Sequence, residues 1–199
     1  MKKNLLLIII FLAFTLAGCE DIGDDFRGIF IDDPDPLITE DDALNQDFSL
    51  ISPKFGIRVS IDDDVDNNTE DVLNAIDDAA TGFLNCQFEE GENIGFEEFE
   101  LEDGKVVPPL SELRMYVVPF TFECQAVDTD TCAGIHFGSD IITIAEKTNN
   151  TCEDFGFLEH EIAHRYGMDA DHDNIGEFED CIEIPGCGFF DFIDRGLGG

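Results

Sequence analysis

The chain has 199 residues, of which 46 are acidic and only 10 are basic, so its formal net charge at pH 7 is −36. Because this charge repels phosphates and anionic headgroups, we expect no nucleic-acid partner and no direct binding to anionic lipid surfaces. An acidic excess of this size is typical of a protein in a saline or calcium-rich medium, where self-repulsion is screened beyond about 8 Å or less.

The first residues have the pattern of a secretory signal peptide. Lys2 and Lys3 give a basic start, and residues 5–17 form an apolar run that is too short for a stable membrane span. Residues 16–19, with the sequence LAGC, resemble the lipobox of bacterial lipoproteins, in which cleavage before the cysteine leaves it lipid-modified. We therefore expect residues 1–18 to be a signal peptide and the exported protein to be anchored to a membrane of the bacterial cell envelope through Cys19.

The segment that follows, residues 19–50, is strongly acidic and has little apolar periodicity. It contains the sequence DDPDP at residues 32–36, where prolines and like charges both oppose a packed core. We predict that it is a mostly disordered tether. The pattern changes near Pro53, and residues 51–199 are enough for one core, so we expect a single folded domain there.

The domain opens with a strand and a long helix. Residues 55–61 alternate between apolar and polar side chains, as a half-buried strand does. A helix is predicted from Thr69, which we assign as the N-cap, with Glu70 and Asp71 in the first turn. Its apolar side chains recur at helical spacing. They are Val72, Leu73, Ile76, Ala80, Phe83 and Leu84.

The second half of the domain adds further strands and one more helix. Residues 96–101 and 113–122 are predicted strands, and the β-branched segment at residues 139–145 is another. A polar loop then leads into a predicted helix at residues 155–166. Together these elements predict an α/β (α+β) fold with a mixed, mostly parallel sheet of about four strands and two long helices.

The cysteines support export into an oxidising compartment. Of the seven cysteines, lipid modification of Cys19 leaves six, which suits three disulfides. The sequence does not decide among the many possible pairings, although Cys124 with Cys132 would close a hairpin and Cys181 with Cys187 a short turn. No CxxC pair is present, so we favour disulfides over zinc binding by cysteine.

A metal-site motif lies at residues 160–164, which have the sequence HEIAH. On a helix, His160 and His164 lie one turn apart on the same face and can bind one metal ion, while Glu161 projects beside it. The chain has only four histidines, and three of them lie between residues 160 and 172. Clustering of so scarce a ligand residue favours a metal site over a helix that carries histidines by chance.

Extended to Gly167, the motif resembles the signature of the metzincin clan of zinc metallopeptidases, HExxHxxGxxH or HExxHxxGxxD. The resemblance implies that residues 51–199 form a small metzincin-like catalytic domain whose second helix carries the zinc site. It implies that His160 and His164 bind Zn²⁺ and that Glu161 is the general base that activates a water on the metal. Gly167 can take the left-handed conformation that ends the helix.

The expected function is therefore that of an exported, lipid-anchored, zinc-dependent endopeptidase that acts as a monomer on peptide or protein substrates. We expect the substrate to lie extended along an edge strand near residues 141–145, because backbone pairing holds a peptide regardless of its sequence. His136 lies just before that strand, and we interpret it as a partly buried loop histidine without a catalytic role.

The third metal ligand departs from the signature, because Ala170 stands at its position and has no donor atom. His172 follows two residues later, and its imidazole suits zinc better than another carboxylate in an already acidic loop. We therefore assign His172 as the third ligand, with Asp169 and Asp171 as the alternatives.

The methionine turn of the clan is also missing, since residues 181–185, with the sequence CIEIP, occupy its place. Glu183 is a further candidate for the third ligand, as in the other large HExxH group. The helix stop at Gly167 argues against the long continuous helix that this group has.

A second hypothesis belongs to another class of protein. Residues 169–180 resemble an EF-hand-like calcium loop, with Asp169, Asp171 and Asp173 in alternation and an aspartate at the twelfth place. Asn174 stands at the sixth place, where the motif needs glycine. If Ca²⁺ organises this loop, the chain would be a calcium-binding surface lipoprotein with a degenerate, inactive protease site. A less complete acidic alternation at residues 62–66 is interpreted as a solvated loop.

Overall fold

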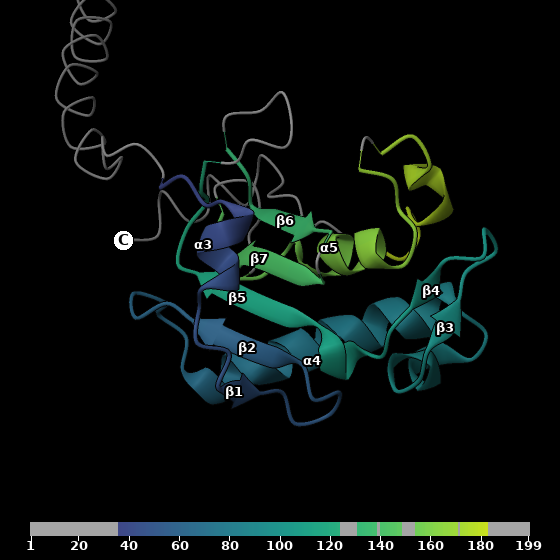
Figure 1. The fold of residues 1–199 in the computed structure, drawn as a ribbon, viewed down its shortest axis with the longest axis horizontal. Coiled ribbons are helices and arrows are strands. Elements are labelled where there is room, and N and C mark those ends of the chain that lie inside the picture. The colour runs from purple at the N-terminus through teal and green to yellow at the C-terminus, as the bar shows by residue number, and fades with distance from the viewer. Residues whose placement is uncertain (1–35, 124–130, 139, 149–153, 171, 183–199) are drawn as a thin grey trace, which may run out of the picture. The chain divides into compact units, whose positions relative to one another are not determined.

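Short apolar segments form a five-stranded sheet with the strand order β1-β2-β5-β7-β6 (Figure 1). Strands β2 and β7 both run parallel to β5, whereas β1 and β6 pair antiparallel at the two edges. The strands are β1 (Leu50–Ile51), β2 (Arg58–Ile61), β5 (Arg114–Val118), β6 (Gly134–Phe137) and β7 (Ile141–Ala145). The structure is a computed structural model that describes residues 36–123, 131–138, 140–148, 154–170 and 172–182.

The predicted mixed sheet in an α/β fold is confirmed, but its details differ. The sheet has five strands rather than about four, and β6 was not predicted. Only two of its four pairings are parallel, so it is not mostly parallel. The predicted strand at residues 96–101 does not join it, because Phe99–Glu100 (β3) instead forms a separate hairpin with Val106–Val107 (β4).

The two sides of the sheet are covered by different helices. Helix α4 (Thr69–Gln87) and helix α5 (Leu158–Arg165) pack on one face around side chains such as Met115 and Ile142. The short helix α3 (Glu40–Leu44) packs on the other face, against Tyr116 and its neighbours. Figure 1 shows α3 in front of the strands and α4 behind them. Three short 3₁₀ turns complete the described elements: Gly91–Gly95, Leu110–Glu112 and Ile175–Glu177.

The ends of both long predicted helices need correction. The N-cap of α4 is Asn68 rather than Thr69, because the Asn68 side chain accepts a hydrogen bond of 3.1 Å from the backbone N–H of Asp71. Helix α5 has eight residues and begins at Leu158, not at residue 155. Phe155 has a φ of +60°, which a right-handed helix excludes, so only α4 is a long helix.

The predicted tether is ordered in its second half. Thr39 and Asp42 form a capping box at the start of α3, and the buried side chains of Ile38 and Ala43 attach this helix to the sheet. The expectation of disorder is therefore wrong for residues 36–50. The first part of the tether, residues 19–35, lies outside the described residues, as do the expected signal peptide and Cys19.

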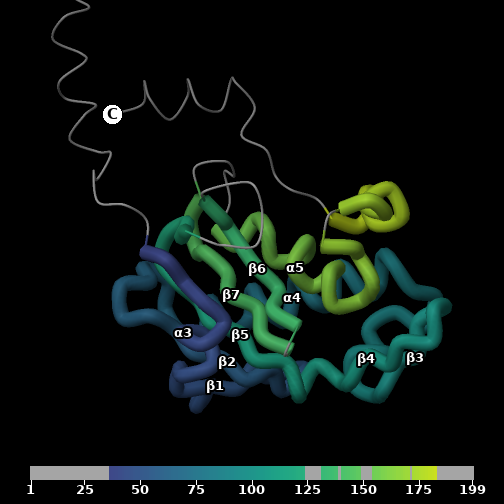
Figure 2. Tube along the Cα trace, turned by 45° about the horizontal axis from the view of Figure 1, so that its top comes forward, coloured from purple at the N-terminus to yellow at the C-terminus, as the bar shows by residue number. Residues whose placement is uncertain are grey.

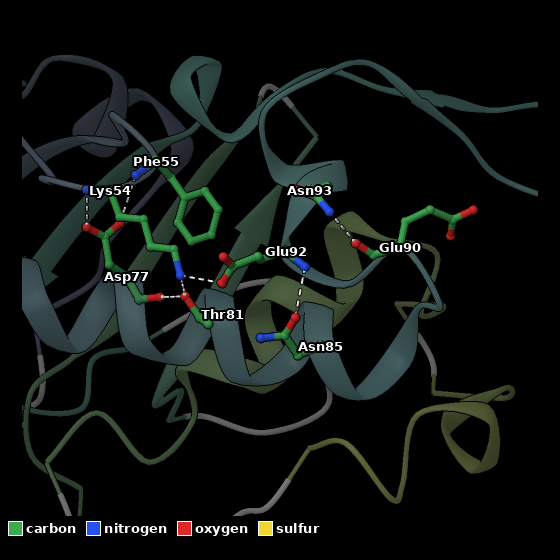
Figure 3. A network of polar contacts seen from close by, with 8 residues as sticks. All are labelled: Lys54, Phe55, Asp77, Thr81, Asn85, Glu90, Glu92 and Asn93. Carbon is green, nitrogen blue, oxygen red and sulfur yellow. Dashed lines mark hydrogen bonds and ion pairs between the residues drawn. The ribbon is translucent and has the colours of Figure 1, made fainter.

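A buried carboxylate fastens α4 to the loop between β1 and β2 (Figure 3). Asp77 on α4 accepts hydrogen bonds from the Ser52 hydroxyl at 2.7 Å and from the backbone N–H of Lys54 at 2.6 Å. The Lys54 ammonium turns to the helix surface, where it donates to the Thr81 hydroxyl and pairs with Glu92. These contacts fix the position of α4 along the sheet, and α4 in turn supports α5.

One disulfide joins distant parts of the chain. Cys86, near the end of α4, is bonded to Cys181, which lies 95 residues later, so the suggested pairing of Cys181 with Cys187 is wrong. Cys132 is also disulfide-bonded. A cross-link that closes a loop of this length stabilises the fold by about 4–5 kcal/mol in the chain-entropy model.

Among the described residues, no helix combines the length and the apolar character that crossing a bilayer requires.

Candidate metal centre

Helix α5 and the loop behind it bring three histidines together. His160 and His164 lie one turn apart on α5, and Gly167, with a φ of +109°, ends the helix as predicted. The chain then turns back beside the end of α5 (Figure 2) and brings the His172 ring to within 3.0 Å of His160.

Two hydrogen bonds from one side chain hold this returning loop. Asn174 donates through Nδ2 to the carbonyl of Gly167 at 2.9 Å, and its Oδ1 accepts from the backbone N–H of Asp169 at 2.7 Å. His172 itself has a φ of +63°, a conformation that few side chains adopt without support. The two hydrogen bonds of Asn174 therefore close the turn that contains His172.

The three rings meet at their Nε2 atoms. The Nε2 of His160 lies 3.0 Å from that of His172 and 3.2 Å from that of His164. The donor atoms of the three rings all lie within 4.8 Å of one another, and in the described ranges they form the one such group of three or more. One metal ion with bonds of about 2 Å fits between nitrogens at this spacing.

The electrostatics of the rings favour neutral imidazoles. The pKa of His160 is lowered to about 4, mainly by burial and also by the neighbouring His164 and His172. Burial also lowers the pKa of His164, although its hydrogen bond to Met168 opposes the shift. Since His164 Nδ1 donates to the carbonyl of Met168 at 3.1 Å, its Nε2 keeps a free lone pair that faces the other two rings.

Glu161 is buried beside the histidines, between α5 and β6. Its side chain is 4 % exposed, and loss of hydration raises its pKa to about 8, although a hydrogen bond from the backbone N–H of His136 opposes this shift. The carboxylate fits only because Gly134 on β6 has no side chain. A Cβ on Gly134 would lie 2.5 Å from the Glu161 Cγ.

A cavity of about 610 Å³ opens in front of these groups. Its described walls come from β6, from α5, from the loop after α5 and from the β3–β4 hairpin. The residues that matter chemically are Lys105, His136, His160, Glu161, His164 and His172. The edge strand beside the cavity is β6. The expectation of an edge strand near residues 141–145 is wrong, because β7 lies between β5 and β6 in the sheet.

Other predicted ligands are placed differently. Ala170 lines the cavity without a donor atom, and Asp169 is not part of the histidine group. Asp171 and Glu183 lie outside the described residues. His136 is partly buried as expected, but it belongs to strand β6 rather than to a loop.

The alternative calcium loop at residues 169–180 gains no support from the described carboxylates. Neither Asp173 nor Asp180 joins a described group of close metal-binding side chains. In the other acidic loop, Asp62 accepts hydrogen bonds from Tyr116 and from the backbone of Asp64, and Asp66 pairs with Lys147. These internal contacts use the oxygens that a cation would need.

An ion pair that the sequence did not reveal anchors the helix end. Arg165 is 1 % exposed, and its Nε donates to Asp140 at 3.0 Å while an Nη donates to the carbonyl of Pro109 at 3.3 Å. The two residues belong to no motif and lie 25 positions apart. The position of Arg165 on the apolar side of the predicted helix is the one feature of the sequence that indicates a buried partner.

Comparison of the chain with models of protein families, with curated proteins and with solved structures finds no match.

The fit between Gly134 and Glu161 can be tested on the metal-free protein. We predict that Gly134→Ala lowers the free energy of unfolding by about 1–3 kcal/mol, because the added methyl group overlaps the buried Glu161 side chain. Gly138→Ala is the matched control, since a Cβ there meets nothing within 4 Å and the change should stay within about 0.5 kcal/mol. Chemical denaturation followed by circular dichroism measures both, and equal midpoints for the two variants would contradict the assignment.

Proposed function

We propose that this chain is a zinc-dependent endopeptidase of metzincin-like character that hydrolyses peptide bonds. The observation that carries the proposal is the convergence of three Nε2 atoms in a cavity that Glu161 also lines. Tetrahedral zinc with Zn–N bonds of about 2.0–2.1 Å separates its ligand nitrogens by about 3.3–3.4 Å. The separations of 3.0 and 3.2 Å are close to this value, and neutral imidazole is a preferred zinc ligand.

Each residue has a role in the proposed reaction. His160, His164 and His172 would hold the metal, which when bound supplies a Lewis acid and lowers the pKa of a water ligand to about 7. Glu161 takes a proton from the attacking water as the water oxygen bonds to the carbonyl carbon. It returns that proton to the amine nitrogen as the C–N bond breaks.

The surroundings of Glu161 support this role. The backbone N–H of His136 and the close fit against Gly134 hold its carboxylate, so the orientation of the Glu161 side chain is fixed. Burial raises the pKa of the Glu161 carboxyl to about 8, so this group can both accept and return a proton near neutral pH.

Strand β6 supports a peptide as the substrate. It is the last strand of the sheet on the cavity side, and its residues Gly134, Ile135 and His136 line the cavity. An edge strand offers backbone N–H and C=O groups to an extended chain, which binds peptides with little regard to their side chains.

Metal binding tests the ligand set. We expect the purified domain to retain about one zinc per chain and His172→Ala to weaken zinc binding more than about 100-fold, since even residues behind a metal ligand contribute about 10–100-fold. Asp169→Ala is the control, because Asp169 lies in the same loop outside the histidine group. Metal analysis and competition with a chelator measure the affinities. Retention of calcium in place of zinc, or a greater loss in the Asp169 variant, would contradict the assignment.

Turnover tests the role of Glu161. We expect Glu161→Gln to keep its zinc and to lose about 10²–10⁴-fold in kcat on a quenched fluorescent peptide, because the amide cannot take the proton from water. His160→Ala should lose both the metal and the activity. If Glu161→Gln loses zinc as completely as the histidine variant, Glu161 is a ligand or a structural group and not the base.

The location follows from the N-terminal sequence. We propose that the mature protein is held at the cell envelope by acyl chains on Cys19, as the sequence LAGC implies. Cys19→Ser should then move the exported protein from the membrane fraction to the soluble fraction. Fractionation with antibody detection measures this, and a variant that stays on the membrane without lipid would show that a protein partner holds it there.

A further inference from the structure

A positive charge lines the cavity of this strongly acidic chain. Of the 46 acidic residues in the sequence, Glu161 alone belongs to the described cavity wall. Lys105 is the one lysine or arginine in that wall. The described wall of the proposed active site therefore carries one lysine and one buried glutamate.

The hairpin that carries Lys105 is firmly attached beside the site (Figure 2). The ring of Phe99 packs 5.1 Å from Phe88, and Phe88 packs 5.6 Å from Tyr166 at the end of α5. Leu101 also reaches the helix end, since its Cδ1 lies 3.3 Å from where a Cβ on Gly167 would stand. The hairpin thus keeps a fixed place relative to the metal ligands on α5.

The backbone of Lys105 is held within this hairpin. Its N–H donates to the Asp103 side chain at 2.8 Å, and its carbonyl accepts from the N–H of Leu101 at 2.8 Å. The next strand, β4, begins at Val106 and buries Val107. The Lys105 side chain therefore starts from a defined point on the cavity wall.

The ammonium group of Lys105 is free to bind a ligand. Lys54, Lys147 and Arg165 each pair with a carboxylate, whereas the Lys105 ammonium has no carboxylate partner within the described ranges. Its charge nevertheless reaches into the cavity. The pKa of His136 is lowered to about 4, mainly by burial, and Lys105 is among the positive charges that contribute to this shift.

We propose that Lys105 is a specificity-determining residue that selects substrates with an aspartate or glutamate side chain close to the cleaved bond. This inference rests on the proposed peptidase function. The acidic exterior does not oppose it, because salt screens charges beyond about 8 Å, whereas a substrate carboxylate in contact with the exposed Lys105 ammonium lies well within that distance. The substrate class is therefore a peptide with an acidic residue near the scissile bond.

Matched peptide pairs test the proposal. Quenched fluorescent peptides carry either Asp or Asn at each position within three residues of the cleaved bond. For the wild-type zinc enzyme we expect kcat/KM to be at least about fivefold higher for Asp than for Asn at one position, mainly through KM. This ratio should fall as the salt concentration rises.

Variants of the lysine decide its role. Lys105→Met should bring the Asp to Asn ratio to about one without slowing the Asn peptides, and Lys105→Glu should favour a Lys peptide over the Asp peptide. Lys54→Met is the control, because Lys54 pairs with Glu92 away from the cavity, and it should keep the wild-type ratio. Equilibrium binding of the same peptides to Glu161→Gln, with and without Lys105→Met, repeats the comparison without turnover.

The outcomes separate this inference from the proposed function. Cleavage of the Asn peptides with no preference for Asp, or a preference that persists in Lys105→Met, overturns the role of Lys105 and leaves the peptidase intact. If wild-type zinc protein cleaves none of the peptides, the peptidase function fails and the inference fails with it.

Discussion

The site depends on the burial of one carboxylate between a helix and an edge strand. Glu161 occupies the space left by Gly134, so α5 can approach β6 closely only while that position has no side chain. The same approach sets the distance from the strand to the histidines, because His160 and His164 are fixed to α5 by the helix geometry. One tight contact therefore aligns the proposed base, two of the proposed metal ligands and the strand proposed to bind the substrate.

Two ties keep α5 in that position. At its end, the ion pair between the buried Arg165 and the partly exposed Asp140 attaches the helix to the start of β7. On the other side, α4 packs against α5, and its own position is fixed by Asp77. Polar contacts at the edges of the core thus position α4 and α5 relative to the sheet and to each other.

The parts of the fold that the sequence predicted are those with a strong local signal. The apolar period of α4 is long enough to predict a helix, and the spacing of His160 and His164 on α5 follows from helix geometry alone. His172 could be assigned as the third ligand because Ala170 has no donor atom and an imidazole follows two residues later. The structure places its ring against the other two.

The parts that were missed depend on contacts between distant segments. Strand β6 is short and contains Gly134, whose purpose is visible only when Glu161 is beside it. The bond between Cys86 and Cys181 spans 95 residues, and no local pattern distinguishes it from a pairing with Cys187. The start of α5 was misplaced because the positive φ of Phe155 leaves no mark in the sequence.

The Cys86–Cys181 bond also determines how the third histidine meets the other two. Residues 167–181 form an arc that α5 holds at one end and the disulfide holds at the other. His172 is thereby confined near the other rings, which raises its effective concentration at the proposed metal position. In a reduced chain only noncovalent contacts, such as the buried side chain of Phe178, would hold the far end of this arc, and closing the proposed ligand set would cost more chain entropy. Formation of this disulfide and convergence of the three histidines are therefore parts of one coupled equilibrium.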